Sequence, residues 1–590
     1  MKRFFLLLCL LNLANASVSG QTNPDWRHKV SPAVQAAYEH GEKADLLVAF
    51  QEQADLRGAR NLKTKSAKAR FVYHQLLQTA SGSQARAICL LREKDARINS
   101  FFLVNAIAVE AADPSMIALL AELPEVRSIS IDPWVPFQEP FLEQNAVTPR
   151  NAIEWGVERI NAPLVWAMGY TGQGITIGGA DTGYDWQHPA LQSKYRGWNT
   201  ADSTASHHYN WHDAMHEVSP LSPDTTVNAC GFDLSSPCDD GFHGTHTMGT
   251  MTGDDEMGNQ IGVAPGARWI GCRNMERGNG KPSSYIECFQ WFLAPTDLNG
   301  LNANPELAPH VINNSWSCPI AEGCTDLTVN ELLREAIINL KASGVVVVVS
   351  NGNSGRNGCN TTNGPPAYFE ESFSVGSTRF DDTLSNFSSR GPVTIDGSNR
   401  IKPNVTAPGS LIRSSFPGGN YQFLSGTSMA GPHVAGLVAL ILSARPDLAG
   451  NVELIEHIVE QSAVYKIDTS NCGIDGTLRP NNAYGWGRVD ALEALNMILE
   501  EVSTTQEPRV FSATVSPNPT KGELLFDLQN MTGAATLTIY GTDGKLVFTT
   551  NRTIQNREQL SVSLANERPG FYFWQVTTAE GSVSGKVVKE

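Results

Sequence analysis

Two kinds of hydrophobic pattern divide the chain. From about residue 150 to 498, apolar runs such as "GITIGGA", "HVINNSW" and "GVVVVVSNG" alternate with segments of helical periodicity. Such near-continuous apolar strands are typical of a parallel sheet covered by helices on both faces. Residues 512–590 instead alternate apolar and polar positions, with Leu524, Phe526 and Leu528 on one face. This period of two predicts an all-β sandwich after the α/β domain.

The region before residue 145 mixes both patterns. Its strands and helices are short, and the second helix is opened by Asp113 as N-cap and Pro114 as first helical residue. We predict strands at 44–50, 101–111 and 126–135, and helices at 67–80 and from 114. Residues 21–145 are therefore expected to form a small α+β unit.

The first residues have the pattern of an export signal. Met1-Lys2-Arg3 precedes the apolar run "FFLLLCLLNL", and the small-residue triplet Ala14-Asn15-Ala16 follows it. About ten apolar residues are too few to span a bilayer, and no later run reaches eighteen. The pattern predicts a signal peptide at residues 1–16 and an exported protein.

Charge and cysteine content narrow the class of protein. The 590 residues have a formal net charge of −16 and no long basic run, which excludes a typical nucleic-acid binder. Eight of the ten cysteines lie in the α/β region, and disulfides persist in exported proteins. Eight cysteines allow 105 connectivities. We favour the near pairs 230/238, 272/288 and 318/324, with 359 and 472 left to pair; a zinc site is disfavoured because no C-x-x-C occurs.

Candidate chemistry begins with "SGTSMAGPHVAG", residues 425–436. Ser428 stands before a predicted helix that runs to about Ser443, where unpaired backbone N–H groups favour developing negative charge. Pro432 is expected at the edge of the first turn. A serine hydroxyl needs a base and a group that orients the base. His243 in "HGTHTMGTM" and Asp181, at the end of a buried strand, are candidates for these roles.

These three motifs, in the order Asp, His, Ser, resemble those of the subtilases, the subtilisin-like serine proteases. "NQIGVAPGARW", "FSSRGP" and "KPNVTAPG" resemble the same family, and "CRNMERGNG" with "CFQWFLAP" is similar to its bacillopeptidase F group. The resemblance covers residues 150–498 and implies a three-layer, parallel-sheet catalytic domain. It implies that Ser428 is the nucleophile, His243 the general base and Asp181 the group that holds the imidazole. His246 is then a structural neighbour.

The resemblance also implies a site for the oxyanion and for the substrate. Asn353 matches the oxyanion asparagine, with Asn351 as a rival because the chain reads Asn-Gly-Asn where the family has Ala-Gly-Asn. The substrate-binding edge strands match Ser315, Trp316 and Ser317, and Ser350, Asn351 and Gly352. Trp316 could equally belong to the core. These segments contain no acidic residue, so we favour an apolar or broad side-chain preference.

Metal sites are weaker candidates. His243 and His246 lack an acidic third ligand at zincin-like spacing. The acidic loop 253–262 is shorter than the family's calcium loop, and we interpret it as a solvated turn. We interpret "HHYNWHDAMHE", residues 207–217, as a surface loop at the cleft. We assign no metal ligand and expect no cofactor; a structural calcium at an unknown site stays open.

The flanking regions resemble known accessory domains. "ADPSMIALLAELPEVRSISID" resembles the end of an inhibitor-type propeptide of subtilases, which has a ferredoxin-like fold. "SPNPTKGELLFDL" and "GFYFWQV" resemble the sorting domain of the type IX secretion system of Gram-negative bacteria. A carbohydrate-binding or adhesive sandwich is the alternative for this tail. The predicted order is a signal peptide (1–16), a propeptide (21–145), a catalytic domain (150–498), a linker (499–511) and a sorting domain (512–590).

Together these patterns predict a secreted or surface-exposed serine endopeptidase made as a zymogen. Its partners are then protein and peptide substrates, its own propeptide as inhibitor, and the secretion machinery, with no nucleic acid. The junction at residues 139–155 is the expected first substrate. The alternative function is that of a catalytically inactive, subtilase-like adhesion or binding protein.

Overall fold

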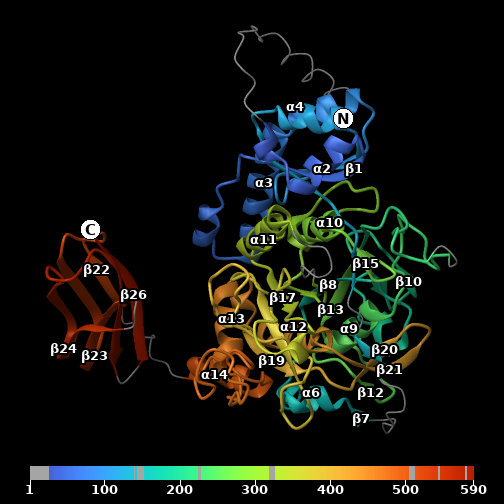
Figure 1. Cartoon of the computed structure of the whole chain (residues 1–590). Coiled ribbons are helices and arrows are strands. Elements are labelled where there is room, and N and C mark those ends of the chain that lie inside the picture. The colour runs from blue at the N-terminus through green and yellow to red at the C-terminus, as the bar shows by residue number, and fades with distance from the viewer. Residues whose placement is uncertain are drawn as a thin grey trace, which may run out of the picture. The chain divides into compact units, whose positions relative to one another are not determined.

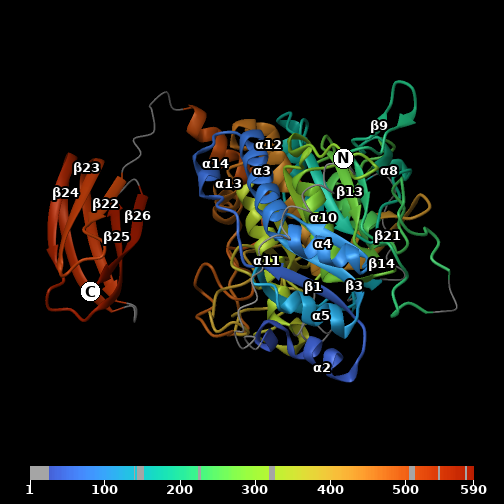
Figure 2. The same ribbon diagram turned by 90° about the horizontal axis from the view of Figure 1, so that it is seen from above.

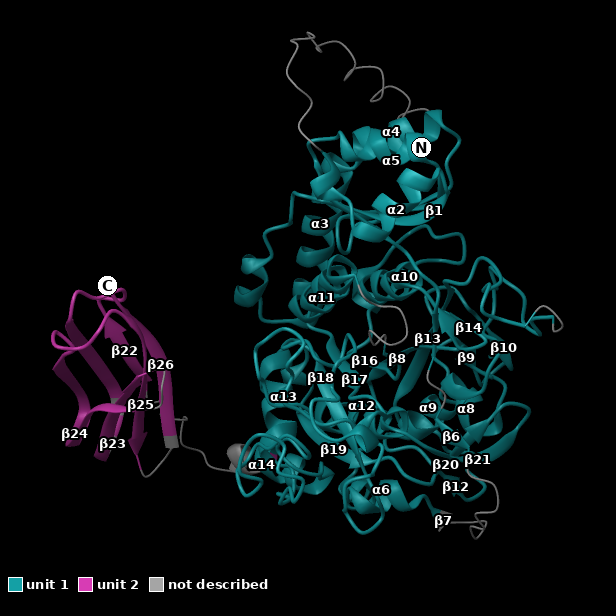
Figure 3. Cartoon of the chain, in the orientation of Figure 1, with its two compact units in different colours: residues 1–498 teal, residues 499–590 magenta. Residues whose placement is uncertain are grey.

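The chain forms two compact units, residues 1–498 and 499–590 (Figures 1 and 3). The structure, a computed structural model, describes residues 26–137, 140–142, 152–223, 227–317, 326–503, 512–541, 545–578 and 581–590. The predicted signal peptide lies outside these residues.

The N-terminal part of the first unit is a four-stranded antiparallel sheet in the order β2-β3-β1-β4. This order, with helices between the outer and inner strands, is the ferredoxin-like arrangement expected from the sequence. Its elements are η1 (Trp26–Lys29), α2 (Pro32–His40), β1 (Ala44–Phe50), η2 (Arg57–Asn61), α3 (Lys65–Ser83), α4 (Ala85–Glu93), β2 (Ile98–Phe101), β3 (Ala106–Ala112), α5 (Pro114–Ala121) and β4 (Val126–Ile131). We call residues 26–131 the N-terminal region.

One predicted strand of this region is wrong and one helix start is confirmed. Residues 101–111 do not form one strand, because the chain reverses between β2 and β3, where Asn105 adopts a positive φ of 44°. Continuous apolar residues hid this turn. By contrast, the Asp113 side chain accepts the Met116 backbone N–H, with Pro114 in the first turn of α5.

The centre of the first unit is a seven-stranded parallel sheet in the order β11-β13-β8-β16-β17-β18-β19. Its apolar strands are almost entirely buried, as their composition predicted. The strands are β8 (Thr176–Asp181), β11 (Trp211–Asp213), β13 (Arg268–Arg273), β16 (Val311–Asn314), β17 (Val346–Ser350), β18 (Phe373–Thr378) and β19 (Val405–Pro408).

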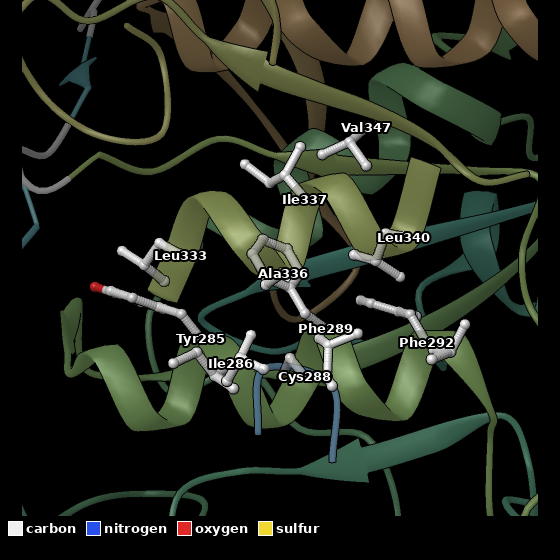
Figure 4. Packing of buried hydrophobic residues seen from close by; sticks show 14 of the residues in the cluster. Tyr285, Ile286, Cys288, Phe289, Phe292, Leu333, Ala336, Ile337, Leu340 and Val347 are labelled. Atoms are coloured by element: carbon white, nitrogen blue, oxygen red, sulfur yellow. The ribbon is translucent and has the colours of Figure 1, made fainter. Parts of the chain in front are cut away.

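Helices cover both faces of this sheet and give the expected three layers (Figure 1). The helices α9 (His243–Thr252) and α12 (Thr427–Ala444) pack together on one face, and α10 (Pro282–Leu293) and α11 (Leu327–Ala342) on the other. Figure 4 shows Phe289 and Phe292 of α10 facing Leu333, Ala336 and Leu340 of α11. The N-terminal region extends this core, since its buried residues Leu47, Phe101 and Leu103 join the same cluster. Figure 2 shows the region from above.

Shorter elements surround the main sheet. Two three-stranded sheets, β14-β15-β5 and β20-β21-β6, lie beside it. Their strands are β5 (Val135–Pro136), β6 (Phe141–Leu142), β14 (Met275–Glu276), β15 (Asn279–Gly280), β20 (Ile412–Phe416) and β21 (Asn420–Ser425); the rest are β7 (Ala152–Ile153), β9 (Trp198–Asn199), β10 (Thr204–Ala205), β12 (Asn259–Gln260), α6 (Trp155–Arg159), α7 (Ala162–Ala167), α8 (Pro189–Gln192), η3 (Pro305–Leu307), η5 (Gly355–Asn357), η6 (Pro446–Leu448), α13 (Val452–Gln461) and α14 (Ala491–Ser503).

Three of the expected disulfides are present: Cys230–Cys238, Cys272–Cys288 and Cys359–Cys472. The pair 318/324 lies outside the described residues. Cys89, which was left out of the pairing, is also disulfide-bonded.

The interpretation of residues 207–217 as a surface loop is wrong. This segment contains β11, the edge strand of the main sheet, and Trp211 and Asp213 are buried. Asp213 binds the fully buried guanidinium of Arg273 through two hydrogen bonds of 2.8 Å. The polar residues on both sides of Trp211, Asn210 before it and His212 and Asp213 after it, concealed the strand.

The second unit is all-β and has an apolar core of its own. Leu524, Phe526 and Leu528 are buried together, as their alternation predicted. Its strands are β22 (Ser512–Ser516), β23 (Glu523–Gly541), β24 (Leu546–Ser563), β25 (Gly570–Thr578) and β26 (Gly581–Lys589). The helix α14 runs to Ser503, so the start of the expected linker is helical.

Among the described residues, α12 has the length and hydropathy that could cross a membrane. It is almost entirely buried inside the first unit, as a core helix would be.

Candidate active site

The three side chains named by the motifs lie at the carboxyl edge of the main sheet and at the starts of α9 and α12. Asp181 is the last residue of β8, His243 the first residue of α9 and Ser428 the second residue of α12. Each is at most 2% exposed. In open α/β sheets this edge is where ligands bind.

Asp181 holds His243 in one orientation. Its Oδ1 is 2.7 Å from Nδ1 of His243 and also accepts the Thr182 backbone N–H, while Oδ2 accepts the hydroxyl of Thr247 at 3.3 Å. A proton on Nδ1 leaves the lone pair on Nε2, which has no hydrogen-bond partner among the described residues. The imidazole can therefore accept a proton at Nε2.

A second carboxylate, which the sequence analysis missed, fixes the start of α9 against β8. Asp239 accepts the hydroxyl of Thr182 at 2.8 Å and both the backbone N–H and the hydroxyl of Thr245. Gly244 completes the contact, because a Cβ there would lie 2.1 Å from the carbonyl oxygen of Gly183. Burial raises the pKa of Asp239 to about 6.

Ser428 and Ser315 are joined by two hydrogen bonds. The Ser428 hydroxyl donates to the Ser315 carbonyl at 3.1 Å, and the Ser315 hydroxyl donates to the Ser428 carbonyl at 2.9 Å. Pro432 explains the hydrogen bond from the Ser315 hydroxyl to the Ser428 carbonyl. This proline lies inside α12 and not, as expected from the sequence, at the edge of its first turn. Proline has no N–H for the carbonyl four residues earlier, so Ser315 supplies the missing donor.

The structure separates the two asparagines that competed for the oxyanion role. Asn351 is buried and its Nδ2 donates to Thr362 and to the Ser389 carbonyl. Asn353 is only partly buried, and its Oδ1 accepts both the backbone N–H and the hydroxyl of Thr427, at 2.9 and 3.0 Å. These bonds turn the Nδ2 of Asn353 away from Thr427. This Nδ2 has no hydrogen-bond partner among the described residues. Asn353 is the better placed donor.

The other predicted substrate-binding residues have differing environments. Ser315 to Ser317 follow β16, while Ser350 ends β17 and Gly352, with a φ of 97°, comes two residues later. The side chain of Trp316 belongs to the core, since its ring stacks on Tyr285 with centroids 3.9 Å apart. Only the backbone at position 316 is thus available to a peptide.

A segment of the chain itself lies in this site. The backbone of β5 pairs with β15, the Phe137 N–H donates to the Gly278 carbonyl at 2.7 Å, and the Phe137 ring packs edge-on against His243 with centroids 4.6 Å apart. Farther along, Phe141 pairs with Ser425 of β21, three residues before Ser428. The sequence analysis missed these partners, because strands of two residues leave no period.

No hydrogen bond joins Ser428 Oγ to His243 Nε2 between these described residues. The Ser428 hydroxyl lies at a helix start and donates to the Ser315 carbonyl, while His243 Nε2 has no hydrogen-bond partner among the described residues. Catalytic hydrogen bonds are often long before a substrate is bound.

The neighbouring His246 serves the fold. Its Nε2 lies 3.1 Å from the carbonyl oxygens of Ile412 and Gln422. Burial, with a smaller effect of His243, lowers the pKa of His246 to about 3 and keeps it neutral.

Among the described residues, no group of three metal-ligating side chains is close enough to bind a metal ion. In the acidic loop, Asp255 accepts the backbone N–H groups of Met257 and Asn259 and the hydroxyl of Tyr421. Its oxygens are therefore already hydrogen-bonded, both within the loop and to β21.

Comparison with known proteins gives two family matches. Residues 172–487 match the subtilase family, and residues 514–590 match a secretion system C-terminal sorting domain. The chain is 34% identical over 506 residues to bacillopeptidase F of Bacillus subtilis (strain 168). The aligned region covers 80% of this chain and 33% of that protein. It thus spans about a third of the length of that relative.

Shorter relatives match over most of their own length. Subtilisin E of Bacillus subtilis (strain 168) is 28% identical over 373 residues, which covers 62% of this chain and 79% of that protein. A subtilisin of Bacillus pumilus is 29% identical over 297 residues, which covers 50% of this chain and 86% of that protein. The subtilase match includes more than half of the chain and all three motif residues, so the chain belongs to the subtilase family and ends in a secretion sorting domain.

Proposed function

We propose that the protein is an exported serine endopeptidase, with Ser428 as nucleophile, His243 as general base and Asp181 as the group that orients the base. The observation that supports it most is the 2.7 Å contact between Asp181 Oδ1 and His243 Nδ1, which leaves Nε2 to accept a proton. These groups and the N-terminal turn of α12 are the parts that acyl transfer by a serine requires.

The chemistry follows from these atoms. His243 Nε2 takes the proton of Ser428 Oγ, and the oxygen attacks the carbonyl carbon of the substrate. The resulting oxyanion accepts hydrogen bonds from Asn353 Nδ2 and the Ser428 backbone N–H. The C–N bond then breaks, the amine leaves with the proton from His243, and water, activated by the same base, hydrolyses the acyl-enzyme.

The substrate is proposed to be an extended peptide held by backbone pairing. The contacts of β5 with β15 and of β6 with β21 indicate how such a strand would lie on either side of Ser428. Residues 315–317 and 350–352 contribute the opposite edge and contain no charged side chain. An apolar or broad side-chain preference is therefore retained as part of the proposal.

The precursor is proposed to be a zymogen. Residues 21–145 act as the prodomain, because their last strand pairs occupy both sides of the catalytic residues and Phe137 covers His243. We place the first cut between Phe137 and Phe141, a window that begins just before the junction expected from the sequence, residues 139–155, and overlaps its start. Residues 138–139 lie outside the described residues.

Export is proposed to use the type IX secretion system of a Gram-negative bacterium, with release to the medium or the outer surface. The match of residues 514–590 to a sorting domain supports this destination. The secretion machinery is then the partner of the second unit. The proposed reaction needs no metal, and a structural calcium is not part of the proposal.

The test is the fate of the precursor. Wild type and Ser428→Ala, both purified from a host without other extracellular proteases, are compared by N-terminal sequencing. We expect wild type to begin between residues 138 and 141 and Ser428→Ala to keep its N-terminal region, since the substitution removes only one hydroxyl. Trimming of Ser428→Ala at the same bond would show that another protease matures the chain.

A further inference from the structure

The N-terminal region contacts the catalytic domain at a second place, far from the cleft. Its first contact is the sheet, which packs on α10 and α11 and brings residues 135–137 to the active site. The second is the amino end of α3, which lies beside α11 in Figure 1 and contacts η3. Only this second contact depends on the lysines at the start of α3.

The side-chain amino groups of Lys65 and Lys68 donate hydrogen bonds to backbone carbonyls of the catalytic domain. Lys65 is 9% exposed and its Nζ donates to the Ala308 carbonyl at 2.8 Å, while Lys68 Nζ donates to the Gly450 carbonyl at 2.7 Å. Nearby, Arg70 pairs with Glu306 at 2.7 Å. All three interactions join two parts of the chain that would separate after the cut, and those of Lys68 and Arg70 are charge-assisted.

The receiving surface fits a lysine closely. Gly450 has a φ of 91°, and a Cβ on it would lie 2.9–3.2 Å from backbone and side-chain atoms of Lys65. A Cβ on Gly344 would lie 3.5 Å from Lys65 Cγ. Gly450 thus provides the space that the first residue of α3 fills, and Gly344 lies in ordinary van der Waals contact with it.

The ends of helices supply the acceptors. Ala308 follows η3 and Gly450 is the second residue after η6, where backbone carbonyls lack donors within the helix. Burial, with a smaller effect of Arg196, lowers the pKa of Lys65 to about 7, and Lys65 has no carboxylate partner among the described residues.

This surface lies at the edge of the sheet opposite the catalytic residues. Ala308 precedes β16 and Gly344 precedes β17, whereas Ser315 and Asn351 follow the same strands. Strands of four and five residues separate the two edges by roughly 15 Å at about 3.3 Å per residue. A cut in the cleft would therefore leave these contacts intact.

We propose that the start of α3 and the surface formed by Ala308, Gly344 and Gly450 are a latch that retains the prodomain after the chain is cut. The latch sets the delay between cleavage and activity toward other substrates. This inference rests on the proposed function, because it presupposes that the prodomain is cut off in the cleft. The partner that the surface fits is a helix start with lysines at its first and fourth positions.

The test compares the two events in the purified full-length precursor. Cleavage is followed by gel electrophoresis and activity by a fluorogenic peptide, for wild type, Lys65→Ala/Lys68→Ala and Lys63→Ala. Lys63 is exposed, is two residues from Lys65 and has no hydrogen bond or ion pair among the described residues, so it is the matched control. We expect the double substitution to shorten the delay at least tenfold, since each lost bond to a charged group is worth about that factor.

An equal delay in Lys65→Ala/Lys68→Ala and Lys63→Ala would overturn the latch. Absence of cleavage in wild type would instead count against the proposed function. If the double substitution prevents folding, Arg70→Glu is measured alone and with Glu306→Arg, because both side chains are about half exposed. The latch then predicts a shorter delay for Arg70→Glu and recovery in the exchanged pair; no change in either would contradict it.

Discussion

Replacing Asn353 by Ala should abolish most catalysis while the enzyme stays folded. The Asn353 amide is held by two hydrogen bonds from Thr427, the residue before the nucleophile, and its Nδ2 is left to meet the oxyanion. Removal of one such donor slows kcat by about 10²–10³, or roughly 2.7–4 kcal/mol, a magnitude measured on a subtilisin. Because the bond forms in the transition state, we expect kcat to fall with little change in KM.

The matched control is Asn351→Ala. Asn351 donates to Thr362 and the Ser389 carbonyl, so its loss should lower stability by about 1–3 kcal/mol and leave kcat of the folded enzyme within a few-fold of wild type. The assay measures kcat and KM on a quenched-fluorescence peptide and, separately, the first-order rate of prodomain cleavage. Both rates should fall by a similar factor in Asn353→Ala.

Two results would refute this reasoning. One is an Asn353→Ala enzyme that keeps more than a fifth of the wild-type kcat. The other is an Asn351→Ala enzyme whose folded fraction loses as much kcat as Asn353→Ala. That result would indicate that Asn351 is the donor to the oxyanion.

Three further predictions concern stability and domain roles. Ser315→Ala, made in the inactive Ser428→Ala precursor, should lower the free energy of unfolding in urea by about 1–3 kcal/mol, because the backbone carbonyl at position 428 loses its donor; an unchanged value would show that water replaces the hydroxyl. Hydrogen bonding to Glu287 raises the pKa of His216 to about 9, so its charge stabilises the fold fully below its ordinary pKa near 6.5 and less as pH rises through about 9. The Ser428→Ala precursor should therefore melt at a higher Tm than Ser428→Ala/His216→Gln, and this difference in Tm should shrink between pH 6 and pH 10. A constant difference in Tm would contradict the raised pKa of His216. A chain ending at Ser503 should cleave peptides at the wild-type rate but lose export, because the second unit has its own core; loss of peptide cleavage would refute the independence of the units.

The sequence predicted the layers of the fold and the position of each motif residue. Fully apolar strands have few alternatives to a covered parallel sheet, and Asp181, His243 and Ser428 each adjoin such a strand or helix. Near cysteines paired as expected, because short loops bring them together.

Features that depend on contacts between distant segments could not be predicted. The edge strand at Trp211 is polar on both sides, so only its neighbour β13 identifies it. Pro432 is tolerated inside α12 because Ser315, more than a hundred residues away, supplies a donor. Likewise, Lys65 reads as one more surface lysine of an amphipathic helix until Gly344 and Gly450 are placed beside it.

The most direct test of the account is labelling by a serine-reactive fluorophosphonate probe. The mature wild-type protein is treated with the probe, digested and analysed by mass spectrometry, with Ser428→Ala as control. We predict one stoichiometric adduct, on Ser428, that is lost in Ser428→Ala and greatly slowed in a variant with His243→Ala. No adduct on a folded protein freed of its N-terminal region, or an adduct on another serine, would contradict the assignment of Ser428 as the nucleophile.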